Sequence, residues 1–309
     1  MTALALARDL AQLREHLQPG PRTVVMTMGA LHQGHLDLVR AAVRHNRAAT
    51  GQDAPGEVKR VDQEAAKADG GQGQVLVTIF VNQLQFGPAE DFEAYPRTLE
   101  ADLAALAGQG VDLVYAPTAR DMYPTGQPQV TIDPGPLGRV FEGAVRPGHF
   151  AGVATVVHKL AARTGATAAV FGQKDAQQLA VIRQMAVDLD LGWQIVGVPT
   201  RREADGLATS SRNRYLSQAE RSAALALPRG IVAGQEAATE GAPPSRIRQI
   251  ARHGLGRGPE PALPDYLDLV DPATFRPVGE AWRGRALLIG ALKVGGTRLI
   301  DNAEVALGT

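Results

Sequence analysis

The chain has 309 residues, and its 32 lysines and arginines balance its 32 aspartates and glutamates, so its formal net charge is zero. This length favours two domains over one small core, and the balance gives no sign of nucleic-acid binding. The absence of cysteine excludes disulfides, thiolate metal sites and a cysteine nucleophile. Because no run of 18 apolar residues and no signal-peptide pattern occurs, we expect a cytoplasmic protein with no membrane partner.

The first two thirds of the chain alternates strand and helix patterns. Short β-branched runs predict strands at 23–26, 75–80, 111–115, 168–171 and 194–198. Helical periodicity predicts helices near 35–45, 99–109, 153–163 and 176–189. This alternation is typical of an α/β fold, a Rossmann-like doubly wound parallel sheet whose ligands bind beyond the carboxyl ends of the strands. We assign residues 1–200 to this domain.

From about residue 201 the pattern changes to a smaller α+β lid domain, 201–309. A capping box from Ser217 to Glu220 predicts a helix start, and Pro228 is expected to kink or end that helix. A second helix is predicted near 245–252. Strands near 266–270, 286–292 and 298–300 predict a small antiparallel sheet.

Residues 46–74 have no aromatic residue, many charges and a glycine-rich end. Such a segment cannot bury a core, so we predict a mobile insertion. The sequence leaves open whether it is a tolerated surface insertion, a lid or contact element, or a short surface helix over 57–68.

The most informative segment is Thr27–His35, Thr-Met-Gly-Ala-Leu-His-Gln-Gly-His. Its flanks predict a strand, a tight glycine turn and a helix. His32 and His35 would therefore lie at a helix N-terminus, where free N–H groups and the dipole favour phosphate. Gly34 would let a nucleotide approach the backbone closely. The alternative is a chance His-x-Gly-His.

Two glutamines follow predicted strands, Gln85 and Gln178. Neutral amide donors suit a carboxylate that must stay nucleophilic, because an arginine clamp would occupy its lone pairs. For each glutamine, a surface or capping role is the alternative.

Further polar groups follow the later strands. Gly172 would permit close backbone approach, Lys174 would supply a charge for phosphate, and Asp175 would accept from a ribose hydroxyl or act as a helix N-cap. The loop Thr209–Arg214 offers hydroxyls, N–H groups and a guanidinium, which fits a polyphosphate clamp or an ordinary polar loop.

Three residues have weaker signals. Arg146 and His149 lie in a long loop before a helix, where they either line the site or hold the loop. Asp102 lies on a predicted helix and is a weak magnesium candidate, with a solvated helix-face acid as the alternative.

These segments together resemble the pantothenate synthetase (pantoate–β-alanine ligase) family of the HxGH nucleotidyltransferase superfamily. The resemblance runs from about Thr23 to Asn302, broken mainly by the insertion. Its most specific motifs are Thr-Met-Gly-Ala-Leu-His-x-Gly-His, Phe-Val-Asn-x-x-Gln-Phe, Ala-Tyr-Pro-Arg-Thr, Arg-Pro-Gly-His-Phe-x-Gly-Val, Phe-Gly-x-Lys-Asp-x-Gln-Gln and Ser-Ser-Arg-Asn-Arg-Tyr-Leu.

The resemblance implies that ATP and D-pantoate form pantoyl adenylate and pyrophosphate. β-Alanine then attacks to give pantothenate and AMP, with Mg²⁺ required and a homodimer as the usual assembly. It implies that Gln85 and Gln178 hold pantoate, that Gln85 also lies near β-alanine, and that His35 is a proton donor. The implied catalytic residues are His32, His35, Lys174, Ser210 and Arg212. The implied ATP-binding residues are Met28, Gly29, His32, Gly34, His35, Gly172, Lys174, Asp175, Arg201, Thr209, Ser210, Ser211 and Arg212, and the implied metal residue is Asp102.

Several positions depart from the family pattern: Met26, Gln83, Ala101, Gln173, Ala176, Arg201 and Thr209. Ala101 stands where an acidic pair is frequent, which weakens the case for a side-chain magnesium site. Because the proposed phosphate donors are intact, we expect activity with altered affinity. The rival readings are a nucleotidyltransferase acting on a phosphate substrate and a nucleotide-binding regulatory protein without catalysis.

Overall fold

The computed structural model describes residues 4–51, 73–88, 90–256 and 264–308, in two compact units. The first unit comprises Met1–Arg139, Gly143–Phe171 and Val181–Val198. The second comprises Val140–Glu142, Gly172–Ala180 and Pro199–Thr309. The second unit thus includes two short segments that precede residue 200 in the chain. The functional assignment of 1–200 and 201–309 stays a prediction.

A six-stranded sheet carries the first unit, in the order β1-β4-β3-β2-β5-β6. Its strands are β1 (Ala5–Ala7), β2 (Arg22–Thr27), β3 (Gln74–Ile79), β4 (Leu113–Tyr115), β5 (Ala168–Gly172) and β6 (Gln194–Val198). The pairings of β1 with β4, β4 with β3, β3 with β2 and β2 with β5 are parallel, which confirms the α/β class. The strand order reverses at β2 and β5, so the loop after β2 begins at a topological switch point.

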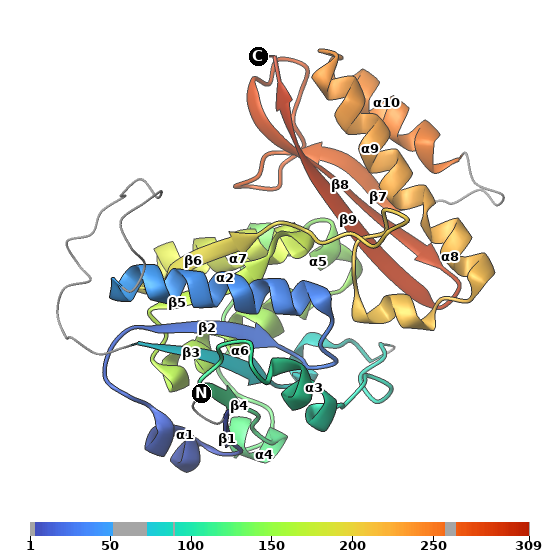
Figure 1. The fold of residues 1–309 in the computed structure, drawn as a ribbon. Helices are drawn as coiled ribbons and strands as arrows, with labels where there is room; N and C mark the ends of the chain where they lie inside the picture. The colour runs from blue at the N-terminus through green and yellow to red at the C-terminus, as the bar shows by residue number, and fades with distance from the viewer. Residues whose placement is uncertain (1–3, 52–72, 89, 257–263, 309) are drawn as a thin grey trace. The chain divides into compact units, whose positions relative to one another are not determined.

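Strand β2 shows why these residues form a central strand. Thr23, Val24 and Val25 are at most 1% exposed, a continuous buried run that is typical of a parallel strand covered on both faces. Helices α2 (Gln33–Thr50) and α6 (His149–Thr164) both pack against β2 (Figure 1). The remaining helices of the Rossmann-like part are α1 (Leu10–His16), α3 (Leu99–Leu106), α4 (Ala119–Met122), α5 (Glu142–Val145) and α7 (Ala176–Asp188).

The bounds predicted for the mobile segment, residues 46 and 74, are wrong, because both residues belong to regular elements. Helix α2 continues through Asn46, which is 7% exposed, to Thr50. Gly51, with φ of +69°, then ends the helix in the left-handed conformation, and β3 begins at Gln74. Residues 52–72, which include the alternative helix over 57–68, lie outside the described residues.

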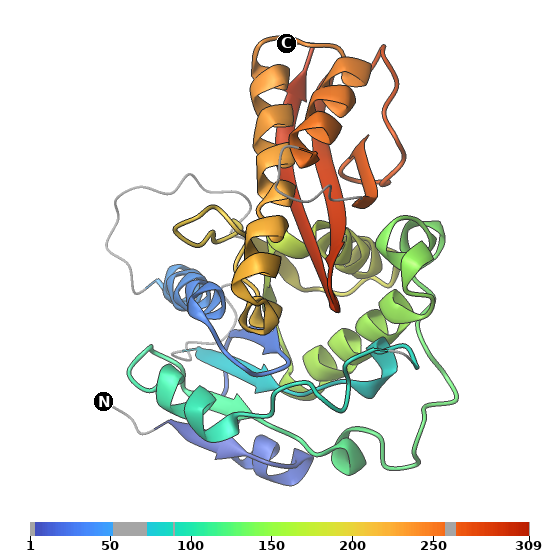
Figure 2. The same cartoon turned by 90° about the vertical axis from the view of Figure 1, so that its right-hand side faces the viewer.

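The second unit contains the predicted antiparallel sheet, formed by β7 (Pro264–Val270), β8 (Gly284–Val294) and β9 (Thr297–Leu307). Helices α9 (Ala226–Thr239) and α10 (Pro244–Leu255) cover one face of this sheet (Figure 2).

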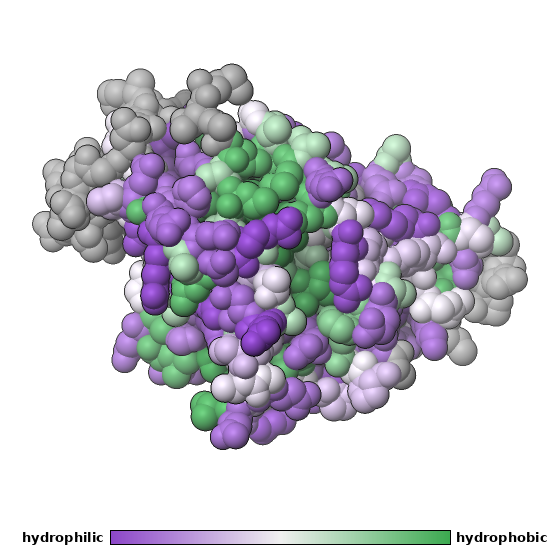
Figure 3. Space-filling model, turned by 90° about the horizontal axis from the view of Figure 1, so that it is seen from below, coloured by the Kyte–Doolittle hydropathy of each residue, from purple (hydrophilic) through white to green (hydrophobic). Residues whose placement is uncertain are grey.

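The surface seen in Figure 3 is largely hydrophilic, with apolar side chains gathered in smaller areas.

The two helix signals of this unit are confirmed. Ser217 N donates to Glu220 Oε2 at 2.8 Å, and Glu220 N donates to Ser217 Oγ at 3.3 Å, at the start of α8 (Gln218–Ala224). Pro228 lies in the first turn of α9. A proline ring clashes with the carbonyl four residues earlier, which here belongs to Ala224, so the first helix ends there.

We expect Ile231→Ala to lower the free energy of unfolding by about 2–5 kcal/mol. Ile231 is fully buried in the core that α9 forms with the sheet, and the substitution would leave a cavity. Val232, the next residue of the helix, is 43% exposed, so Val232→Ala should change stability by less than about 0.5 kcal/mol. Urea denaturation measures both, and equal losses would contradict this core assignment.

Candidate functional site

The loop after β2 is shaped around Gly29. Thr27 Oγ1 donates to the carbonyl of Thr78 at 2.9 Å and accepts from the N–H of Gly29 at 3.2 Å. Gly29 has a φ of +82°, and a Cβ on it would lie 3.0 Å from Asp102 Oδ2. Glycine is therefore required here by conformation and by space. Ala30 follows with a φ of +51°, an uncommon conformation of the kind found at ligand-binding loops.

Asp102 of α3 holds this loop in place through hydrogen bonds to its main chain. Its carboxylate accepts from the N–H of Leu31 at 2.8 Å and of Ala30 at 3.0 Å, and from the Thr98 hydroxyl at 3.3 Å. Asp102 is 3% exposed, so its interpretation as a solvated helix-face acid is wrong. The carboxylate instead accepts hydrogen bonds from two N–H groups that the tight turn leaves without main-chain partners.

His32 and His35 form a reciprocal cap at the start of α2. His32 Nδ1 accepts from the N–H of Gly34 at 3.1 Å, and the N–H of His32 donates to His35 Nδ1 at 3.3 Å. Since each Nδ1 accepts, the hydrogen-bond network assigns the proton of each neutral ring to Nε2. The rings stack with centroids 4.0 Å apart. Two Nε2–H donors therefore accompany a helix N-terminus, which favours anions.

Gln85 lies in η1 (Gln83–Gln85), which follows β3, and is 9% exposed. Asn82 Nδ2 donates to Gln85 Oε1 and to the carbonyl of Gly152, each at 3.1 Å. Asn82 Oδ1 accepts from the N–H of Leu84 at 3.3 Å. Because a main-chain carbonyl only accepts and a main-chain N–H only donates, the orientation of the Asn82 amide is fixed.

The orientation of Asn82 determines that of Gln85. With Oε1 bound by Asn82, the Gln85 Nε2 group is the donor end, and it lies 3.1 Å from Met28 Sδ. Tyr123 strengthens the arrangement by donating its hydroxyl to Asn82 Oδ1 at 2.8 Å. Asn82 is 1% exposed. The sequence motif contained Asn82, but only the contacts reveal that it orients Gln85.

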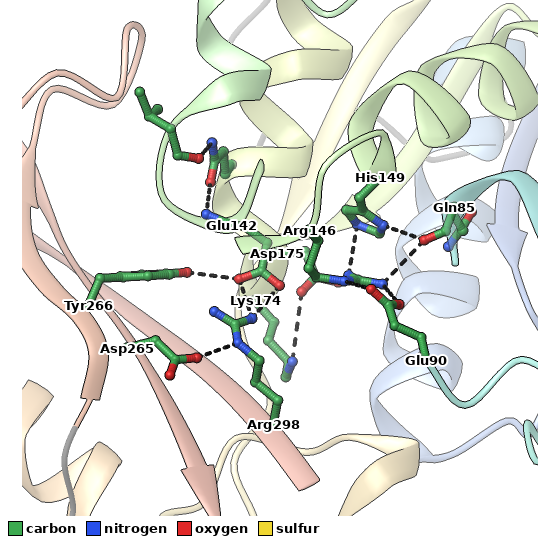
Figure 4. A network of polar contacts seen from close by, with 12 residues as sticks. Gln85, Glu90, Glu142, Arg146, His149, Lys174, Asp175, Asp265, Tyr266 and Arg298 are labelled. Carbon is green, nitrogen blue, oxygen red and sulfur yellow. Dashed lines mark hydrogen bonds and ion pairs between the residues drawn. The ribbon is translucent and has the colours of Figure 1, made fainter. Parts of the chain in front are cut away.

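Arg146 and His149 hold the same loop (Figure 4). His149 Nδ1 is 2.8 Å from the carbonyl of Gln85, and its Nε2 is 3.1 Å from Arg146 NH1. Arg146 also donates to both carboxylate oxygens of Glu90. Burial opposes ionisation of Glu90, but the hydrogen bonds and charge of Arg146 outweigh it and lower the pKa of the carboxyl. His149 begins α6 rather than lying in a loop.

In the second unit, η3 (Gln173–Asp175) carries Lys174 and continues into α7, which carries Gln178. Lys174 Nζ lies 3.8 Å from Asp175 Oδ1. Gly172 has an ordinary φ of −76°, so its backbone conformation does not require glycine.

The predicted phosphate clamp of the second unit has its own local structure. Ser210 caps η4 (Ser211–Tyr215) by accepting from the N–H of Arg212 at 3.3 Å. The N–H of Thr209 donates to the carbonyl of Arg201 at 2.9 Å, so these two predicted residues are paired through their main chains. Asn213 Nδ2 donates to Glu203 Oε1 at 2.6 Å and secures the loop.

The predicted site residues thus form two sets. The set of the first unit comes from the loop after β2, the start of α2, η1 after β3, and α3, and consists of Met28, Gly29, His32, Gly34, His35, Gln85 and Asp102. The second unit carries Gly172, Lys174, Asp175, Gln178, Arg201, Thr209, Ser210, Ser211 and Arg212. Across the described ranges, no cluster of three or more histidine or acidic side chains could hold a metal. Among the helices of the described residues, none combines the length and the apolar character that a membrane-spanning helix needs.

Comparison with known proteins identifies the family. The model of the Pantoate-beta-alanine ligase family matches residues 4–50 and 56–304. Pantothenate synthetase of Acidothermus cellulolyticus is 49% identical over 302 residues, which cover 96% of this chain and 90% of that protein. Pantothenate synthetase of Thermobifida fusca is 47% identical over 309 residues, covering 97% and 94%.

Solved structures agree with this match. The crystal structure of pantothenate synthetase from Thermus thermophilus has a TM-score of 0.84 at 41% identity and covers 98% of this chain and 100% of that one. Pantoate-beta-alanine ligase from Francisella tularensis, complexed with beta-gamma ATP and beta-alanine, has a TM-score of 0.71 at 29% identity, with 97% of each chain covered. This chain belongs to the pantoate–β-alanine ligase family.

Proposed function

We propose that the protein joins D-pantoate to β-alanine to form pantothenate, while ATP is cleaved to AMP and pyrophosphate. The observation that carries the proposal is the pair of imidazole donors at the start of α2, in a chain that belongs to this ligase family. The Francisella tularensis relative, complexed with beta-gamma ATP and beta-alanine, supports both compounds as ligands.

The reaction proceeds in two steps in this proposal. A carboxylate oxygen of pantoate attacks the α-phosphorus of ATP. The bond between the α-phosphorus and the oxygen that bridges it to the β-phosphorus breaks, and pyrophosphate is released. The amine of β-alanine then attacks the acyl carbon of pantoyl adenylate, loses a proton and displaces AMP. The protein makes no covalent bond in either step, so positioning and charge stabilisation supply the catalysis.

Charge develops on the phosphates during the first step. We assign its stabilisation to the Nε2–H groups of His32 and His35, to the Lys174 ammonium, and to Ser210 and Arg212. His35 keeps the proton-donor role that the resemblance implies. The complete set proposed to bind ATP is Met28, Gly29, His32, Gly34, His35, Gly172, Lys174, Asp175, Arg201, Thr209, Ser210, Ser211 and Arg212.

Pantoate is assigned to the amides of Gln85 and Gln178. The donor end of Gln85 is oriented by Asn82, so it offers N–H to a carboxylate without the charge of an arginine. A neutral donor leaves the carboxylate more nucleophilic than an ion pair would. Gln85 is also the residue proposed to lie near β-alanine.

Magnesium is proposed to enter with the phosphates of ATP. Mg²⁺ commonly retains several waters and binds substrate phosphates with only one or two protein carboxylates. The oxygens of Asp102 already accept two main-chain N–H groups and a hydroxyl, which fits a loop-positioning role and does not fit a metal ligand. A cytoplasmic location and a homodimer, with no nucleic-acid or membrane partner, complete the proposal.

The proposal is tested by measuring pyrophosphate release from ATP with D-pantoate, before and after β-alanine is added. A pantoate-dependent burst followed by turnover on addition of β-alanine is expected. ATP binding without a burst would favour a regulatory protein, and turnover with a phosphate substrate in place of pantoate would favour another nucleotidyltransferase.

We expect His35→Ala and Lys174→Ala each to reduce the burst rate by roughly 10²–10³, the usual cost of one preorganised donor. Circular dichroism should show the fold retained. His16→Ala, at an exposed position of α1, is the control and should leave the rate unchanged. A near-normal burst in either variant would refute the role assigned to that residue.

Asp102→Asn separates loop positioning from metal binding. The amide nitrogen cannot accept, so one N–H of Ala30 or Leu31 would lose its partner, and the KM for ATP should rise about tenfold, or 1.4 kcal/mol. The Mg²⁺ concentration for half-maximal rate should stay the same. Glu100→Gln, at an exposed position of the same helix, is the matched control. An altered Mg²⁺ requirement with unchanged KM for ATP would instead indicate a metal ligand.

A further inference from the structure

Strand β9 presents polar side chains on its outward face, among them Arg298 and Asn302. Thr297, Leu299, Asp301 and Ala303 are buried, whereas the alternate residues Arg298, Ile300 and Asn302 are partly exposed. Alternation with a period of two places Arg298 and Asn302 on the same face of the strand. Asn302 contacts the turn that carries Lys174. Arg298 contacts Glu142.

Asn302 binds the turn that carries Lys174. Its single Nδ2 atom donates to the carbonyl of Gln173 at 3.0 Å and to the carbonyl of Lys174 at 2.8 Å. The amide nitrogen of Asn302 thus binds two consecutive carbonyls of η3. Because these partners can only accept, the amide must present its nitrogen to the turn.

The main chain of Asn302 is itself fixed. Its N–H donates to Asp301 Oδ1 at 2.8 Å, and Asp301, which is 3% exposed, receives both terminal nitrogens of Arg202 at 2.7 and 3.0 Å. Strand β9 pairs with β8 along its whole length, from the pair Gly284 and Leu307 to the pair Val294 and Thr297, without a register shift. Asn302 therefore projects from a rigid element, as a residue that positions another must.

The helix that follows the turn has a separate anchor. Gln177 Oε1 accepts from the N–H of Glu142 at 3.1 Å, and Gln177 Nε2 donates to the carbonyl of Val140 at 2.9 Å. The Glu142 carboxylate in turn accepts from Arg298 at 2.5 Å and from the Tyr266 hydroxyl at 3.1 Å (Figure 4). Burial raises the pKa of Tyr266 and keeps its hydroxyl a donor. Loss of the Asn302 amide would release the turn while α7 stays held.

We propose that Asn302 is a positioning residue that sets the direction of Lys174 by binding the carbonyls of its turn. This proposal rests on the phosphate-binding role proposed for Lys174. The lysine side chain is long and flexible, so the main chain beneath it determines where its ammonium group acts. A displacement of about 1 Å is enough to cost roughly 10²-fold in rate.

The test compares Asn302→Ala, which removes the donor, with Asn302→Asp, which has the same shape but places a carboxylate beside two carbonyl oxygens. We expect the rate of pantoate-dependent pyrophosphate release to fall about 10–100-fold in Asn302→Ala and at least as far in Asn302→Asp. The melting temperature should change little, and the KM for pantoate should be unchanged. Glu304→Gln, two residues along the same face in an exposed pair with Arg285, is the matched control and should keep the normal rate.

A double-mutant cycle with Lys174→Ala identifies the path of the effect. If Asn302 acts through Lys174, the double variant should be no slower than Lys174→Ala alone. Multiplied losses, or an equal loss in Glu304→Gln, would overturn the positioning role and leave the role of Lys174 standing. A normal rate in Lys174→Ala would overturn the role of Lys174 first, and the role of Asn302 with it.

Discussion

The geometry of the proposed phosphate site depends on the Asp102 carboxylate beneath the loop after β2. A tight turn from a buried strand into a helix leaves main-chain N–H groups without partners, and burying them unpaired would cost about 1–3 kcal/mol each. Asp102 accepts from two of them. The turn is then free to place His32 at the start of α2, where the two imidazoles cap the helix reciprocally.

This arrangement gives the histidines a defined chemical state. Each Nδ1 accepts a hydrogen bond of the helix cap, so the N–H of each neutral ring is at Nε2. Aspartate would cap the helix equally well, but its carboxylate only accepts and would leave no donor on the same side chain. The imidazole therefore serves the local fold and the proposed phosphate contact together.

In the second unit too, polar side chains outside the proposed substrate contacts hold the segments that carry the proposed site residues. Lys174 and Gln178 lie on a short turn and the first turn of a helix, which by themselves are weakly constrained. The outward face of β9 supplies the constraint. Asn302 binds the turn, and Arg298 binds Glu142, whose N–H donates to Gln177 of the helix. In the first unit, Asn82 plays the equivalent part for Gln85. Polar residues outside the proposed substrate contacts thus decide where the contacting groups point.

The sequence by itself determined the α/β class, the three-stranded antiparallel sheet, the break before Pro228 and the family, because these depend on local periodicity, capping and ordered motifs. It missed β1, since a strand of three residues has too few positions to show a period. It also ended α2 at residue 45, although Asn46 to Thr50 are still helical. Only the tertiary structure decided the roles of Asp102, Asn82 and Asn302. Asp102 is 71 residues from Leu31, and Asn302 is 128 residues from Lys174. A hydrogen bond between groups so distant in the chain depends on how strands and helices pack, and no local pattern records it.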